Sequence, residues 1–111
     1  MQIQGINHIL LSVSNLEKSI AYYQNVFDAK LLVKGRSTAY FDLSGIWLAL
    51  NEEKDIPRNE IHASYTHMAF SIKAEDFKAW EKHLKQLDVP ILEGRERSEE
   101  DKQSIYFTDL E

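Results

Sequence analysis

The sequence predicts an α+β fold made of paired β-α-β-β-β modules, with the second module lacking its final strand. Three observations support this prediction. A short apolar segment with an internal histidine occurs twice, at residues 7–13 and 66–72. A pattern typical of an amphipathic helix follows each segment, and short strand patterns follow each helix. Because a repeated pattern usually encodes a repeated structural unit, the chain is expected to form two related modules within one domain.

The two histidine segments share the same order of residue types. Residues 7–13 and 66–72 each contain a histidine, then apolar residues, then a serine and a β-branched residue. Short segments rich in apolar and β-branched residues are typical of buried strands. Each segment is therefore predicted to be the first strand of its module.

Helical spacing of apolar residues follows each predicted first strand. Ser14 and Glu17 form a Ser-x-x-Glu pair, which predicts a capping box at the start of the first helix. Apolar residues then recur every three or four positions, as expected for one face of a helix that packs on a core. They are Leu16, Ile20, Tyr23 and Phe27 in the first helix and Phe77, Trp80, Leu84 and Leu87 in the second.

The remaining strands set the boundaries of the two modules. In the first module, strands are predicted at residues 30–33, 38–43 and 46–50, and in the second at 89–92 and 104–108. Module one is assigned to residues 1–51, a polar linker containing Pro57 to 52–64, and a truncated module two to 65–111. After Tyr106-Phe107 only four residues remain, and the terminal Leu110-Glu111 pair resembles a cloning junction. A shortened chain is therefore expected, with a naturally short chain as the alternative.

Composition argues against several functional classes. The 111 residues carry a formal net charge of −5, which argues against nucleic acid as the main partner. No apolar run approaches the ~20 residues of a membrane span, and no signal-peptide pattern is visible, so a cytoplasmic protein without a membrane partner is expected. The chain has no cysteine. Any thiol chemistry must therefore use a thiol that arrives as a substrate.

His8 and His67 are the candidate metal ligands, because they occupy the same place in two copies of one module. Two neutral imidazoles that converge on a pseudo-two-fold axis offer two nitrogen ligands to one metal. The alternative is two core histidines, each bonded to a backbone carbonyl. A carboxylate is the usual third ligand beside two histidines, and it is expected on the absent final strand rather than at Asp109 or Glu111. His62 and His83 lack this symmetry, and solvated roles are expected for both.

Longer motifs accompany the two histidines over most of the chain. They are Gly5-Ile6-Asn7-His8, Thr38-Ala39-Tyr40-Phe41, Ile46-Trp47-Leu48-Ala49-Leu50-Asn51-Glu52-Glu53, Ile56-Pro57-Arg58-Asn59-Glu60, Ser64-Tyr65-Thr66-His67, Gly94-Arg95-Glu96-Arg97 and Ser104-Ile105-Tyr106-Phe107. With these motifs the chain resembles the vicinal oxygen chelate superfamily, which has a glyoxalase-like fold. Within that superfamily it resembles the bacillithiol-type metallothiol transferases that confer fosfomycin resistance.

The resemblance implies an enzyme that opens the epoxide of fosfomycin with bacillithiol or cysteine. It implies Mg²⁺ or Mn²⁺ as cofactor, held by His8 and His67, and a homodimer whose modules pair between chains. No residue is assigned as catalytic. The substrate-binding residues implied are Tyr40, Trp47, Tyr65, Arg95 and Tyr106. Because the expected carboxylate ligand is missing, this chain is predicted to fold and dimerise but to bind metal weakly and show little or no activity.

Two other functions remain open from the sequence. Another metal enzyme of the superfamily, of the glyoxalase or dioxygenase type, would share the histidine pair. A non-enzymatic drug-binding module of the bleomycin-resistance type would need no metal, which would leave the two in-strand histidines without a purpose. For single residues the alternatives are packing for Tyr40 and Trp47 and a solvated surface charge for Arg95.

Overall fold

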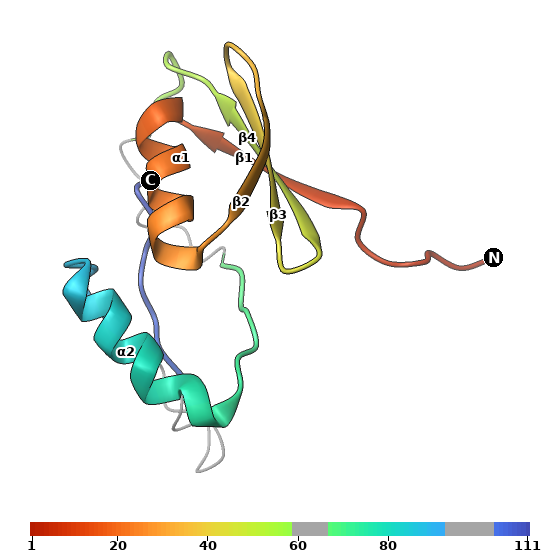
Figure 1. Cartoon of the computed structure of the whole chain (residues 1–111). Coiled ribbons are helices and arrows are strands. Elements are labelled where there is room, and N and C mark those ends of the chain that lie inside the picture. The colour runs from red at the N-terminus through yellow and green to blue at the C-terminus, as the bar shows by residue number, and fades with distance from the viewer. Residues whose placement is uncertain (59–66, 93–103) are drawn as a thin grey trace. The chain divides into compact units, whose positions relative to one another are not determined.

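The computed structural model describes residues 1–58, 67–92 and 104–111. The chain divides into two compact units. Unit 1 consists of Met1–Asn59 together with Leu110–Glu111, and unit 2 consists of Glu60–Asp109. Figure 1 shows the elements of both units.

Unit 1 contains one helix and a four-stranded mixed sheet, in the β-α-β-β-β order expected for module one. The strand order is β1-β4-β3-β2, with β1 parallel to β4 and the other neighbours antiparallel. The helix covers one face of this sheet (Figure 1). The elements are β1 (His8–Val13), α1 (Leu16–Phe27), β2 (Lys30–Lys34), β3 (Thr38–Leu43) and β4 (Ile46–Glu52).

The core of unit 1 lies between α1 and the sheet face that α1 covers. Phe41 of β3 and Leu48 and Leu50 of β4 are fully buried there, and Leu16, Ile20 and Tyr23 of α1 pack in the same cluster. Because successive side chains of a strand point to opposite faces, the residues between these core positions lie on the other face of the sheet. That face carries His8, Tyr40 and Trp47, three of the residues expected to form a site.

The start of α1 differs from the predicted capping box. Asn15 is the N-cap, and its side-chain oxygen accepts a hydrogen bond from the Lys18 backbone N–H at 3.0 Å. Ser14 lies one residue earlier and donates instead to Glu111. The Glu17 carboxylate pairs with Lys34 at 2.8 Å. In a capping box it would instead accept a hydrogen bond from the backbone N–H at the start of the helix. The prediction was wrong by one residue because asparagine caps a helix as well as serine does.

Unit 2 contains a short 3-10 helix, η2 (Ala74–Asp76), followed directly by α2 (Phe77–Gln86). Leu84 is its buried helical residue, while Leu87, predicted on the same face, is the C-cap and is 39% exposed. Leu92 and Tyr106 form an antiparallel bridge, in which the Leu92 N–H donates to the Tyr106 carbonyl at 2.6 Å. The two strands predicted at 89–92 and 104–108 are thus reduced, in the described residues, to this bridge.

The predicted buried strand at 66–72 was wrong for residues 67–72. These residues form no assigned strand, and Met68, Phe70 and Ile72 are about two-fifths exposed. Unit 1 provides the physical reason, because there β1 is held by pairing with β4, the last strand of its module. In the part of the chain that the structure describes, no strand ladder includes residues 67–72. An apolar pattern predicts a strand, but the strand forms only when a ladder partner is present.

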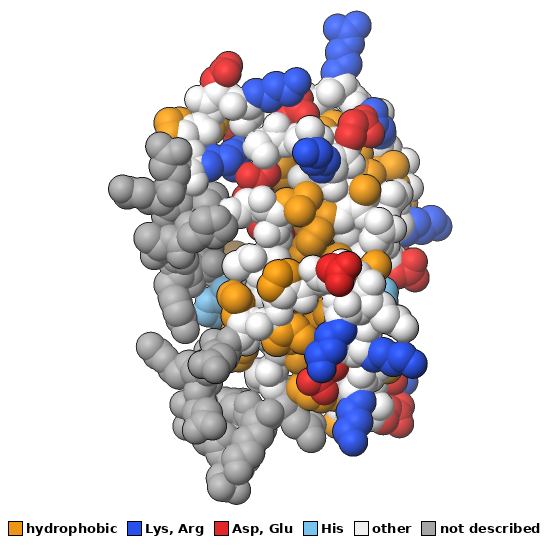
Figure 2. All heavy atoms as spheres, turned by 90° about the vertical axis from the view of Figure 1, so that its left-hand side faces the viewer, with side chains coloured by type: hydrophobic (Ala, Val, Ile, Leu, Met, Phe, Trp, Pro, Cys, Tyr) orange, Lys and Arg blue, Asp and Glu red, His pale blue; other side chains and the backbone are white. Residues whose placement is uncertain are grey.

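Charged and apolar side chains share the surface. On the face drawn in Figure 2, basic and acidic side chains of the described residues are interspersed, and apolar side chains reach the surface between them. Within the described ranges, no helix is long and apolar enough to cross a membrane.

Candidate functional site

His8 is the first residue of β1 and lies on the sheet face opposite α1. The neighbouring residues Ile9 and Leu11 point the other way and pack against the core cluster. His8 is therefore directed away from the core, and its side chain is exposed. An exposed imidazole at the end of a paired strand is accessible to a ligand and fixed in place by its backbone.

Trp47 lies directly opposite His8 in the parallel pairing of β1 with β4. The two rings have centroids 5.4 Å apart, with an angle of 57° between their planes. Trp47 is 43% exposed, so its indole forms a wall beside the histidine rather than part of the core.

Tyr40 extends this wall on the next strand. Its ring centroid lies 5.5 Å from that of Trp47, at an interplanar angle of 49°. Tyr40 pairs with Ala49 across the β3–β4 ladder, and Ala39 and Phe41 on either side of it are buried in the core. His8, Trp47 and Tyr40 therefore form one row across three adjacent strands. This aromatic row brings together three of the residues predicted for the site.

The His8 ring also contacts its sequence neighbour. The Nδ1 atom of His8 lies 2.8 Å from Oδ1 of Asn7, a hydrogen-bonding distance. The other ring nitrogen, Nε2, is the atom left for an external ligand. An imidazole nitrogen suits several divalent first-row metals, so the chemistry of His8 fits a metal ligand.

His67 belongs to unit 2 and is exposed at the start of the described part of that unit. Its pairing with His8 stays a prediction. Among the residues whose positions are described, no group of three or more histidines, aspartates and glutamates is placed to hold a metal ion. His83 contacts Trp80, with ring centroids 5.5 Å apart.

The other predicted substrate contacts lie in unit 2 or outside the described residues. Tyr106 is half-buried, and its backbone forms the bridge with Leu92. Tyr65 and Arg95 lie outside the described residues, as does His62. Their roles therefore stay predictions.

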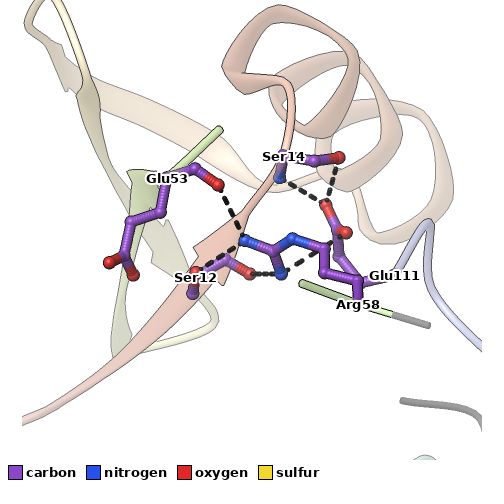
Figure 3. A network of polar contacts seen from close by, with 5 residues as sticks. All are labelled: Ser12, Ser14, Glu53, Arg58 and Glu111. Carbon is purple, nitrogen blue, oxygen red and sulfur yellow. Dashed lines mark hydrogen bonds and ion pairs between the residues drawn. The ribbon is translucent and has the colours of Figure 1, made fainter. Parts of the chain in front are cut away.

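A polar network around Arg58 was not predicted from the sequence (Figure 3). The Arg58 guanidinium donates through Nη2 to Ser12 Oγ at 2.8 Å and through Nη1 to the Ser12 carbonyl at 3.3 Å. Nη2 also donates to the Glu53 carbonyl at 3.2 Å, and Nη1 pairs with Glu111 Oε2 at 3.5 Å. Arg58 therefore connects β1, which carries His8, to the segment that follows β4.

The carboxylate of Glu111 completes this network. Its Oε1 accepts from the Ser14 N–H at 2.6 Å and from the Ser14 hydroxyl at 3.0 Å. The side chains of Arg58 and Glu111 are only 16% and 11% exposed. No local sequence pattern predicts these contacts, because Ser14, Arg58 and Glu111 lie far apart in the chain.

The sequence is similar to characterised proteins over nearly its whole length. Residues 5–111 match the family model described as "Glyoxalase/Bleomycin resistance protein/Dioxygenase superfamily". The metallothiol transferase FosB of Lysinibacillus sphaericus is 66% identical over 109 residues, which cover 98% of this chain and 77% of that protein. The FosB of Bacillus licheniformis is 64% identical, over 97% of this chain and 70% of its own length.

Solved structures with the same fold include fosfomycin resistance proteins. FosX from Listeria monocytogenes superposes with a TM-score of 0.83 at 31% identity, covering 98% of this chain and 86% of its own. An E126Q mutant of that FosX, complexed with Mn(II) and 1S,2S-dihydroxypropylphosphonic acid, also gives a TM-score of 0.83, at 29% identity. These likenesses confirm the predicted fold class.

Proposed function

This chain belongs to the metallothiol transferase FosB family of the glyoxalase superfamily, and we propose that it acts as a metal-dependent thiol transferase on fosfomycin. The observation that carries the proposal is 66% identity to a FosB over 98% of the chain. The aromatic row of His8, Trp47 and Tyr40 supports it, because it places a metal-ligating nitrogen beside a wall suited to a small substrate. The comparisons do not favour a glyoxalase, a dioxygenase or a bleomycin-binding module.

We propose that His8 and His67 hold a divalent ion, Mg²⁺ or Mn²⁺. A Mn(II)-bound FosX among the structural relatives supports this choice of ion. When bound, such an ion supplies Lewis-acid stabilisation for the oxygen that becomes an alkoxide as the epoxide opens. His8 contributes an imidazole nitrogen in a fixed orientation, because its ring contacts both the Trp47 indole and the Asn7 amide.

The substrate contacts follow from the chemistry of the side chains. The Trp47 indole provides an apolar surface for the carbon skeleton of the drug. The Tyr40 hydroxyl is a hydrogen-bond donor for a phosphonate oxygen, and Tyr65 and Tyr106 are proposed for the same role. The Arg95 guanidinium is proposed to bind two phosphonate oxygens at once through its planar fork of donors.

The reaction itself needs a thiol from outside the chain, because the sequence has no cysteine. The thiolate sulfur forms a bond to an epoxide carbon, the bond from that carbon to the ring oxygen breaks, and the oxygen takes up a proton. Bacillithiol, or cysteine in its place, is the proposed thiol. Holding the sulfur in line with the breaking bond lowers the barrier, because the two reactants no longer have to find each other in solution.

A homodimer in the cytoplasm is the proposed working form. The sheet face that carries His8 also exposes Leu10, at 53%, and Trp47, at 43%. Pairing of modules between two chains would cover this apolar surface and bring a His67 to each His8. We expect metal binding to be weak in this 111-residue chain, because residues 67–72, which include His67, form no assigned strand, whereas β1 is held by its pairing with β4.

The proposal is tested by incubating the chain with fosfomycin, bacillithiol and Mn²⁺ and following the adduct by mass spectrometry. The longer L. sphaericus relative is the positive control. The chain is expected to form the adduct more slowly than the relative, and both His8→Ala and a chelator should abolish it. His83→Ala, on the helix α2, is the matched control and should leave the rate unchanged. Adduct that forms as fast in His8→Ala as in the unaltered chain, or that forms at the same rate with a chelator present, would overturn the proposal.

A further inference from the structure

The contact between Asn7 and His8 favours one of the two positions for the proton of the neutral imidazole. Oδ1 of Asn7 lies 2.8 Å from Nδ1 of His8. An amide oxygen can only accept a hydrogen bond, so a hydrogen bond between these two atoms requires Nδ1 to carry the hydrogen. In neutral His8 this leaves Nε2 with an unshared electron pair.

We propose that Asn7 is a positioning residue that holds His8 in the Nδ1–H tautomer and thereby presents Nε2 to the metal. This inference rests on the proposed function, because it assumes that His8 is a ligand. A metal-bound histidine usually donates its other ring N–H to an oxygen acceptor, which fixes the tautomer and the direction of the ring. Asn7 provides such an acceptor from the residue next to the ligand.

Two further contacts restrict the orientation of the His8 ring. The Trp47 ring lies beside His8 at 5.4 Å and limits rotation of the imidazole. The backbone at His8 is fixed because it pairs with Trp47 in the β1–β4 ladder. The Asn7 amide then holds one edge of the ring, so the opposite edge, with Nε2, is presented for ligation. Without the amide, either tautomer of a neutral histidine could form.

The chain offers a matched set of variants. Asn7→Leu removes the acceptor with little change in size, whereas Asn7→Asp keeps an oxygen acceptor at the same place. Asn25→Leu makes the same substitution at an exposed position of α1 and is the control. None of these residues is itself a proposed metal ligand.

The first readout is the tautomer of His8 in the metal-free chain, from nitrogen-15 NMR shifts of the imidazole at a pH where the ring is neutral. The chain, Asn7→Asp and Asn25→Leu are expected to show the Nδ1–H form, whereas Asn7→Leu should gain the Nε2–H form. If His8 of the unaltered chain carries its proton on Nε2, the inference is overturned.

The second readout is Mn²⁺ affinity, measured by the loss of the free-ion electron paramagnetic resonance signal. Asn7→Leu is expected to bind Mn²⁺ about tenfold more weakly, as typical for loss of a partner that orients a ligand. Asn7→Asp should restore most of the affinity, which a merely structural role would not predict. Equal affinity of the chain and Asn7→Leu would overturn the inference. If His8→Ala and the unaltered chain bind Mn²⁺ alike, the proposed metal role of His8 fails instead, and the NMR result still determines whether Asn7 sets the tautomer.

Discussion

His8 and Trp47 face each other across the parallel pairing of β1 with β4, with their ring centroids 5.4 Å apart. The register of two strands therefore places a metal-ligating nitrogen beside an apolar wall. Neither residue belongs to the core cluster, since the buried residues of β4, Leu48 and Leu50, point to the opposite face. Substitutions of His8 and Trp47 should therefore change the function of this face with little effect on the stability of unit 1.

Trp47→Ala should weaken fosfomycin binding and should destabilise the fold less than the loss of a buried tryptophan would. Because Trp47 is 43% exposed, the free energy of unfolding should fall by less than the ~3–5 kcal/mol typical of a buried tryptophan. Loss of the apolar wall should raise the KM for fosfomycin by about tenfold, or ~1.4 kcal/mol. Urea unfolding and adduct kinetics measure the two effects. Trp47→Phe should retain most of the binding, and an unchanged KM in Trp47→Ala would contradict the role of the indole.

Asn15→Ala should lower the free energy of unfolding by about 1 kcal/mol, because it removes the side-chain oxygen that caps α1. Asn15 accepts from the Lys18 N–H at 3.0 Å. Asn15→Ser should restore most of the loss, since serine is also a good N-cap. Urea denaturation followed by circular dichroism provides the comparison. Full stability of Asn15→Ala would show that this cap contributes nothing to the fold.

The sequence predicted the fold of unit 1 more fully than the fold of unit 2. The helix and strands of unit 1 were predicted in the right order, because each carries its own periodic pattern. Thr38–Leu43 matches its predicted bounds, and Leu16–Phe27 includes all four apolar residues expected on its inner face. Residues 67–72 have an equally good strand pattern but no assigned strand, because pairing depends on a second segment that the local pattern does not specify.

The candidate site was also predicted only in part from the sequence. His8, Trp47 and Tyr40 were predicted, and the structure places them in one row because strand alternation and register determine which side chains are neighbours. The Arg58–Glu111 pair was missed, because these residues are far apart in sequence and their charges have no local pattern. The Asn7 contact lies within the quoted Gly5-Ile6-Asn7-His8 motif, but only the geometry indicates which ring nitrogen it holds.

Glu111→Ala should destabilise unit 1 by roughly 1–2 kcal/mol, because it removes the acceptor for two Ser14 donors and the partner of Arg58. Both charged side chains are mostly buried, so the pair is less screened by solvent than a surface ion pair. Asp55→Ala, at an exposed carboxylate, is the matched control and should change stability by less than about 0.5 kcal/mol. Equal unfolding midpoints for the two variants would show that the network is energetically neutral.

The most direct test of the metal site is a Mn²⁺ titration of the chain in the presence of fosfomycin, followed by electron paramagnetic resonance. The unaltered chain and His83→Ala should both remove free Mn²⁺ from solution. His8→Ala, which keeps the fold because His8 is exposed, should leave the free-ion signal at its full height. Mn²⁺ binding by His8→Ala with the affinity of the unaltered chain would contradict the assignment of His8 as a metal ligand.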